Sequence, residues 1–243
     1  MTIKSKKINL IKTLVVLNII IYMIFTWWDI FGASILISSD SLKYISIVIV
    51  FITSLITRED ALSFKDLHLL QLGLFITLLA DYFLLFSNKY ILGMFLFSIV
   101  QILYSFRYEF RNLKYTIRNF IIIFLGLFLL HIILNKFFVE LDFIWVMGLF
   151  YGICLLTSFR RAFKAYKYKI YPEPNRQMIL IGMILFLLCD INVGLYNILG
   201  YMGKVDVFYN ISFVSMWLFY LPSQILLALS GYNYNQGEMK KWN

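Results

Sequence analysis

Charged residues are scarce in this chain. They make up 14% of its 243 residues, while hydrophobic residues make up 61%. A soluble globular domain has roughly 25% charged residues, so this composition excludes an ordinary soluble domain. The chain also has only two histidines and two cysteines, too few for a zinc-ligand set or a disulfide framework. No phosphate-binding loop or dinucleotide fingerprint is present. We therefore expect neither a metal nor another cofactor.

Long apolar segments account for most of the sequence. A helix that spans a bilayer needs roughly 17 to 25 mostly apolar residues, and these segments lack the alternation of membrane β-strands. The sequence therefore predicts an all-α membrane protein, a bundle of about eight transmembrane helices that forms a single polytopic domain over residues 1–243. The predicted spans are Leu10–Trp28, Leu42–Thr57, Leu67–Phe86, Tyr90–Phe106, Asn119–Leu134, Phe143–Phe159, Met178–Leu199 and Val207–Leu229.

Basic residues are distributed unevenly among the segments that connect these spans. If the N-terminus is inside, all of the 22 Lys and Arg residues except Lys43, Lys89, Lys136 and Lys204 fall on the cytoplasmic side. The positive-inside rule then places both termini in the cytoplasm. No connecting segment is long enough for a nucleic-acid-binding domain, so the net charge of +9 predicts contact with anionic membrane lipids. The Ile-, Lys-, Phe- and Tyr-rich composition suggests the cytoplasmic membrane of a bacterium.

Two further features concern the connections and contacts of the helices. The longest connecting segment, Arg160–Gln177, carries two prolines and is expected to lie as a loop on the cytoplasmic headgroups. Gly148 and Gly152 form a G-x-x-x-G pattern, which predicts close packing of the sixth span against another helix. The sequence gives no indication of the oligomeric state.

Two aspartates, Asp81 and Asp190, lie in the interior of the third and seventh spans. No span has a Lys or Arg in its interior that could neutralise them. An ionisable residue inside a membrane segment is costly and usually functional. The alternative is a protonated aspartate that only joins two helices by a hydrogen bond. Two aspartates at similar depth favour a function.

Other polar side chains fall on the same helix faces as the aspartates. With a rise of 1.5 Å per residue, Asp81, Asp190 and Gln101 lie roughly 21, 18 and 14 Å from the cytoplasmic ends of their helices. Side chains three, four or seven residues apart share a helix face. We therefore expect these side chains to face one amphipathic cavity. The residues expected around it are Asp81, Asp190, Gln101, Tyr104, Asn197, Tyr220 and Gln224.

The order of these residues repeats faintly in the two halves of the chain. The third and fourth spans carry LLAD and VQILY, and the seventh and eighth carry LLCD and SQILLA. Four helices per half would give two parallel four-helix repeats, an arrangement known among transporters. The repeat motivates one hypothesis for the function, as an alternative to an enzyme. In this hypothesis the chain is a small proton-coupled transporter or lipid-binding membrane protein that uses the same aspartates.

The same motifs resemble those of the YhhN-like family of integral membrane lysoplasmalogenases. Members are small eight-helix proteins with a Gly-Asp run, a Leu-Gly…Phe…His…Tyr helix, a late Ser-Asp run and a C-terminal Tyr…Gln helix. Gln101 stands where a histidine is usual, and Ala80 replaces a glycine. The counterparts in this chain are Ala80-Asp81, Leu92-Gly93…Phe97…Gln101…Tyr104, Cys189-Asp190 and Tyr220…Gln224.

The resemblance implies a hydrolase that acts on a lysophospholipid. It would cleave the vinyl ether bond of a lysoplasmalogen to a fatty aldehyde and glycerophosphoethanolamine or glycerophosphocholine. Such a bond hydrolyses by protonation at carbon, capture of the oxocarbenium ion by water and collapse of the hemiacetal. Two close carboxyls can share a proton, so that one is acidic and the other ionised, as in glycosidases. The resemblance thus implies that Asp81 and Asp190 are the catalytic groups. The residues then expected to bind substrate are Gln101, Tyr104, Asn197, Tyr220 and Gln224.

Overall fold

The computed structural model describes residues 3–32, 37–109, 113–137 and 140–234. Within these ranges the regular structure is helical, apart from one isolated bridge between Ala61 and Tyr232. Eight of the helices are long and apolar enough to cross a membrane, which confirms the expected fold. They are α1 (Ile3–Phe31), α2 (Ser39–Ile56), α3 (Phe64–Leu85), α4 (Tyr90–Tyr108), α5 (Leu113–Phe137), α6 (Phe143–Lys167), α7 (Asn175–Tyr201) and α8 (Val207–Leu229), with a short 3-10 helix, η1 (Thr57–Asp60), after α2.

Several helices begin at a polar cap that the sequence supplies. The side chains of Ser38, Asp142 and Asp206 accept hydrogen bonds from backbone N–H groups in the first turns of α2, α6 and α8. Such caps satisfy donors that have no partner inside the helix. These caps therefore help to set where each of these three helices begins.

The expectation of a long loop over Arg160–Gln177 is wrong in its first half. Helix α6 continues to Lys167, because no proline or glycine interrupts the sequence before Pro172. Ala162 and Ala165 in this extension are buried. Only residues 168–174 connect α6 to α7, and Tyr171 in this connection is buried in the bundle.

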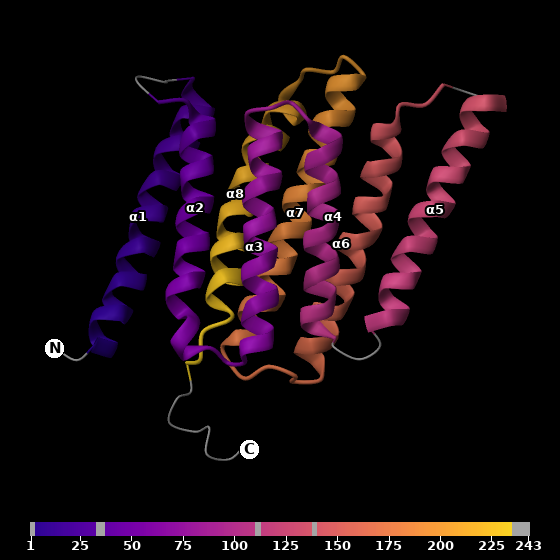
Figure 1. Ribbon diagram of the computed structural model, residues 1–243. Helices are drawn as coiled ribbons and strands as arrows, with labels where there is room; N and C mark the ends of the chain where they lie inside the picture. The colour runs from indigo at the N-terminus through magenta and orange to yellow at the C-terminus, as the bar shows by residue number, and fades with distance from the viewer. Residues whose placement is uncertain (1–2, 33–36, 110–112, 138–139, 235–243) are drawn as a thin grey trace.

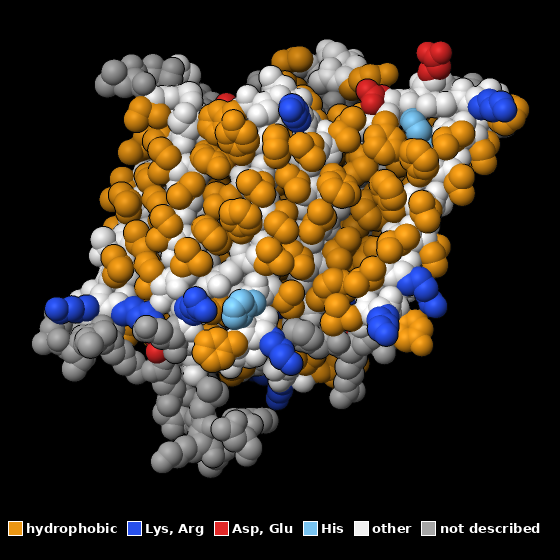
Figure 2. Space-filling model, viewed as in Figure 1, with side chains coloured by type: hydrophobic (Ala, Val, Ile, Leu, Met, Phe, Trp, Pro, Cys, Tyr) orange, Lys and Arg blue, Asp and Glu red, His pale blue; other side chains and the backbone are white. Residues whose placement is uncertain are grey.

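The helices stand side by side, with α1 at one edge of the bundle and α5 at the other (Figure 1). The start of α1 and the end of α8 lie at the same end, here named the terminal end; the opposite end is named the far end. Most Lys and Arg side chains visible in Figure 2 gather at the terminal end, and hydrophobic side chains cover the middle. Three basic residues expected on the cytoplasmic side, Arg111, Lys240 and Lys241, lie outside the described residues.

The neighbours of α1–α4 recur in α5–α8. Helix α3 packs against α4 as α7 packs against α8, and α2 contacts α3 as α6 contacts α7. Across the halves, α2 contacts α8 and α6 contacts α4. Helices α1 and α5 are peripheral, since little of either is buried. This neighbour pattern agrees with two parallel four-helix repeats, and a common origin of the two halves stays a prediction.

Close helix packing occurs at a different glycine from the expected ones. A Cβ added at Gly152 would meet nothing within 4 Å, and one at Gly148 would meet only the Met94 Sδ, at 4.0 Å. The prediction of close packing at these two glycines is therefore wrong. At Gly73, in contrast, an added Cβ would lie 2.7 Å from Cε1 of Tyr104. The Tyr104 ring of α4 therefore lies directly on the α3 backbone.

A buried ion pair closes the terminal end of the bundle. Arg107 donates from Nε and Nη2 to the Asp66 carboxylate at 2.9 and 3.0 Å, and Nη2 also donates to Ser230 at 3.0 Å. The Tyr171 hydroxyl lies 2.7 Å from both Asp66 Oδ1 and the Arg107 carbonyl oxygen. Burial, and then the Asp66 charge, raise the pKa of Tyr171 well above its ordinary value, so this hydroxyl stays a donor. Together these bonds join α3, α4, the α6–α7 connection and α8.

A second buried ion pair lies at the far end. The Lys43 ammonium on α2 is 3.0 Å from Asp29 on α1 and 3.4 Å from Asp40. It also lies 5.2 and 5.4 Å from the ring centroids of Phe213 and Trp217 on α8. Charge and aromatic rings thus hold α1, α2 and α8 together at this end.

Candidate active site

Asp81 lies one turn before the end of α3, and its side chain is inside the bundle with only 4% of the residue exposed. The hydroxyl of Tyr220, on α8, donates to Asp81 Oδ2 at 2.7 Å. Tyr220 is itself 5% exposed. The structure therefore brings together two residues that the sequence assigned to one site, although they are 139 positions apart.

Asp190 lies near the middle of α7 and has a tyrosine partner from another helix. The hydroxyl of Tyr151, on α6, donates to Asp190 Oδ2 at 2.5 Å. Both residues are partly exposed, unlike the first pair. The sequence-based site did not include Tyr151. The sequence did contain a signal for Tyr151, because its hydroxyl lies in the middle of an otherwise apolar span. The depth estimate that linked the two aspartates would also have supported including Tyr151 in the site.

The Phe97 ring of α4 lies between the two Asp–Tyr pairs. Its centroid is 6.0 Å from the ring of Tyr151 and 6.3 Å from the ring of Tyr220. Phe186 of α7 packs against Phe97 and Tyr220 at 6.1 and 5.8 Å. Each Asp–Tyr pair therefore reaches the Phe97 ring through its tyrosine. Five helices, α3, α4, α6, α7 and α8, therefore contribute to one site.

Neither carboxyl of this site pairs with a basic side chain. In the described part of the chain, the ion pairs of Lys and Arg involve other acidic residues, such as Asp66 and Asp29. A carboxylate removed from water without a cation is costly. The site therefore differs in kind from the two buried ion pairs that stabilise the ends of the bundle.

Three predicted substrate-binding residues lie toward the terminal end from the aspartates. Gln101 is one helical turn beyond Phe97, Gln224 is one turn beyond Tyr220, and Tyr104 follows Gln101 on α4. All three are fully buried. Their role in substrate binding stays a prediction.

The structure does not bring Asn197 to the other residues. Its side chain is exposed and donates to the Val193 carbonyl of its own helix at 2.7 Å. Asn197 lies about two turns, or roughly 10 Å, beyond Asp190 toward the far end. The last turns of α7 pack against the start of α8, where Tyr196 stacks on Tyr209 with 4.3 Å between the ring centroids. Asn197 lies outside this contact and stays exposed, so helical spacing alone did not place it correctly.

A comparison with protein-family models matches residues 38–231 to the YhhN family. This chain belongs to the YhhN family. The match runs from the start of α2 to just after α8 and so includes both Asp–Tyr pairs. Comparisons with curated proteins and with solved structures gave no significant match. The YhhN resemblance of the four motif-bearing helices is confirmed.

Gln101, at which this chain differs from the YhhN pattern given by the resemblance, lies beside two side chains of α6. Ser158 of α6 donates to Gln101 Oε1 at 2.5 Å, and Gln101 also lies next to Tyr151. Its Nε2 has no hydrogen-bond partner of normal geometry among the described residues. Gln101, which the resemblance places where a histidine is usual, thus lies close to the tyrosine that bonds Asp190.

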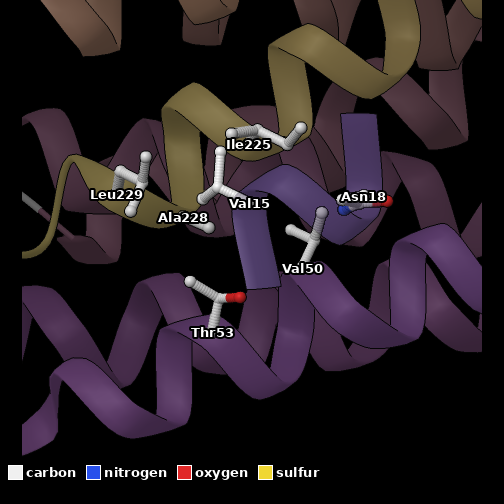
Figure 3. A pocket seen from close by; sticks show the side chains of 7 residues that line it. All are labelled: Val15, Asn18, Val50, Thr53, Ile225, Ala228 and Leu229. Atoms are coloured by element: carbon white, nitrogen blue, oxygen red, sulfur yellow. The ribbon is translucent and has the colours of Figure 1, made fainter. Parts of the chain in front are cut away.

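Two cavities of this YhhN chain lie away from the aspartates. One, of about 10 Å³, lies between α1, α2 and α8 (Figure 3). The other is an open groove of about 420 Å³ at the terminal end. The expected amphipathic cavity around the aspartates stays a prediction. The first cavity is lined by Val15, Asn18, Val50, Thr53, Ile225, Ala228 and Leu229, and the second by Lys6, Lys7, Leu10, Leu55, Ile56 and Arg58.

Proposed function

We propose that this YhhN chain is a membrane hydrolase that cleaves the vinyl ether bond of a lysoplasmalogen. The products are a fatty aldehyde and glycerophosphoethanolamine or glycerophosphocholine. The observation that carries the proposal is the pair of carboxyls without a cation, Asp81 and Asp190, each bonded to a tyrosine hydroxyl beside the same phenylalanine ring. Membership of the YhhN family and the resemblance to its lysoplasmalogenases support it.

The proposed reaction uses the two carboxyls in different protonation states. Two nearby carboxyls in a low-dielectric site share a proton, so one is a general acid and the other a base. The acid protonates the second carbon of the alkenyl chain, and an oxocarbenium ion forms at the first carbon. The carboxylate stabilises this cation and takes a proton from the water that adds to it. The hemiacetal then collapses, a proton passes to the glycerol oxygen, and aldehyde and alcohol leave.

The two tyrosines orient the carboxyls in this scheme. Tyr220 and Tyr151 each donate to the Oδ2 of their aspartate, which leaves Oδ1 for proton transfer. Phe97 and Phe186 supply an apolar wall beside the reacting atoms, a setting typical of small-molecule sites. The partly exposed Asp190 is the carboxyl that a lipid entering from the bilayer would meet first.

The membrane orientation completes the proposal. The basic residues that gather at the terminal end support a cytoplasmic location for this end and for both termini under the positive-inside rule. The substrate is a membrane lipid and can reach the site from the hydrocarbon layer. The composition favours a bacterial cytoplasmic membrane.

The test is aldehyde release from 1-alkenyl lysophosphatidylethanolamine by the purified protein in detergent, where no gradient exists. Wild type should release aldehyde, while the 1-alkyl analogue, which lacks the vinyl group, should not react. Asp81→Asn and Asp190→Asn should each lower kcat by about 10² to 10⁴, the usual contribution of a general acid or base. Size-exclusion profiles and thermal unfolding check that both variants are folded.

Two results would count against the hydrolase. Normal turnover by both Asn variants would remove the two-carboxyl mechanism. No aldehyde from wild type, together with gradient-driven proton movement in proteoliposomes that Asp81→Asn abolishes, would support a proton-coupled transporter instead.

A further inference from the structure

Buried polar side chains continue from the aspartates toward the terminal end. Helices α3 and α8 run in opposite directions, and Tyr220 of α8 contacts Asp81 of α3. Thr77 and Gln224, four residues from each of these, therefore lie together one turn closer to the terminal end. Gln101 reaches the same level on α4, four residues after Phe97.

Two tyrosines of α4 extend this row. Gly73 lies one turn closer to the terminal end than Thr77. An added Cβ at Gly73 would be 2.7 Å from the Tyr104 ring, so Tyr104 also lies one turn closer to the terminal end. The Tyr108 ring centroid is 6.2 Å from that of Tyr104, and Arg107 Cζ is 5.7 Å from the Tyr108 ring. The row thus ends at the Arg107–Asp66 ion pair. We name it the polar column; its members are Thr77, Gln101, Tyr104, Tyr108 and Gln224.

The polar column is buried, and its hydrogen-bonding groups are unpaired. Four of its members are 0% exposed and Tyr108 is 2% exposed. Within the described residues, no hydrogen-bond partner of normal geometry exists for the hydroxyls of Thr77, Tyr104 and Tyr108, for Gln101 Nε2 or for either amide atom of Gln224. A buried polar group without a partner costs about 1–3 kcal/mol. Several in one column would consume much of a domain's stability unless another polar molecule bonds to them.

We propose that the polar column binds a chain of water molecules that connects the terminal end to Asp81 and Asp190 and supplies the water for hydrolysis. Each member offers a donor or an acceptor, and none is charged, which suits water better than an ion. One helical turn of about 5.4 Å also equals the span of two hydrogen bonds of about 2.8 Å through one water. The role of the water as a reactant rests on the proposed hydrolase function.

The proposal explains how both reactants reach the same site. A lysoplasmalogen can enter from the hydrocarbon layer, but the reaction consumes one water for each ether bond cleaved. Bulk water cannot cross the apolar outer surface of the bundle to reach Asp81, which is 4% exposed. The column offers water a separate route of hydrogen-bonding groups from the end where the basic residues gather.

X-ray radiolysis of the full-length wild-type protein in detergent, read by mass spectrometry, tests whether water is bound there. Hydroxyl radicals generated from bound water oxidise adjacent side chains. Tyr104 and Tyr108 should be oxidised in the folded protein in spite of their burial. Met147 and Phe150, which are 2% and 5% exposed in the apolar cluster between α5 and α6, should be protected. Protection of Tyr104 to the same degree as Met147 would overturn the proposal.

Two matched variants test whether the water takes part in the reaction. Tyr104→Phe keeps the ring against Gly73, and Thr77→Val keeps the side-chain shape; each removes one unpaired hydroxyl. Each should lower kcat about 3- to 10-fold, the scale of one hydrogen bond, with no loss of thermal stability. A purely structural role would change the melting temperature and leave kcat unchanged.

The outcomes separate this inference from the proposed function. Aldehyde release by wild type combined with a protected Tyr104 would remove the water chain and leave the hydrolase. An oxidised Tyr104 without any aldehyde release would keep the water chain and remove the hydrolase. Normal kcat in both hydroxyl variants would show that the column's water is not the reactant.

Discussion

Asp81 and Asp190 occupy corresponding helices of the two halves, α3 and α7, yet their surroundings differ. Asp81 is almost completely buried and bonded to Tyr220 of α8, whereas Asp190 is partly exposed and bonded to Tyr151 of α6. Two carboxyls at a similar depth therefore have unequal environments. Such inequality is what a reaction with one acid and one base requires.

The unequal surroundings of the two aspartates can be traced to one hydroxyl group. Phe97 and Tyr220 each lie four residues before the glutamine of their half, Gln101 and Gln224, so they take the same place in the two halves. The second half supplies a hydroxyl there and the first half supplies none. Asp190 instead receives its hydrogen bond from Tyr151 of α6. A single Phe/Tyr difference therefore makes the site asymmetric.

The largest effect on stability is expected at a third buried carboxyl, Asp66. Asp66→Asn leaves Arg107 buried without its counter-charge, which should cost about 3–5 kcal/mol of stability. Asp81→Asn should cost far less, because Asp81 has no cation to leave unpaired. Thermal and denaturant unfolding in detergent measure both. Equal losses in the two variants would show that Asp81 is also mainly a structural group.

A smaller effect is expected from the two tyrosines, and it should be unequal. A hydrogen bond to a charged group contributes about 1.5–3 kcal/mol, so Tyr220→Phe should lower kcat about 10- to 100-fold. Tyr151→Phe should have a smaller effect, because Asp190 is partly exposed and another polar molecule can replace the lost donor. Aldehyde release measures both variants. A larger loss of kcat in Tyr151→Phe than in Tyr220→Phe would contradict the expected difference between the two tyrosines.

The smallest effect is expected at Gln101. Gln101→His restores the residue usual in the YhhN pattern next to Ser158 and Tyr151, and it should keep or raise kcat if that position transfers protons. Gln101→Leu, of similar size, is the control and should not raise it. An inactive histidine variant that still folds would indicate that this chain uses an amide at the position for a different purpose.

The sequence predicted the features that depend on composition along one helix. Eight spans follow from apolar length alone, and Asp81 and Tyr220 stand out because each is a polar group deep in an apolar span. Helix ends were less certain, since α1 and α5 extend beyond their apolar cores at both ends. Polar residues at those ends continue the helix without adding to the hydrophobic signal.

The features that depend on contacts between helices could not be predicted. Tyr151 faces Asp190 because of how α6 and α7 are rotated against each other, which no spacing within either helix reveals. Arg107 was expected at the headgroups from its charge, but it is 1% exposed because Asp66 and Ser230 surround it. Asn197 has the correct spacing, yet its side chain is exposed and bonds only to its own helix.

The ion pair at the terminal end also has a consequence for synthesis of the chain. Tyr171 and Ser230, which complete the shell around Asp66 and Arg107, come 105 positions after Asp66 and 123 positions after Arg107. Until the α6–α7 connection and the end of α8 have been made, the ion pair of the α3–α4 hairpin lacks these two partners. The shell around it is therefore complete only when the last helix is in place, and a chain that ends before α8 lacks the hydrogen bond from Arg107 to Ser230.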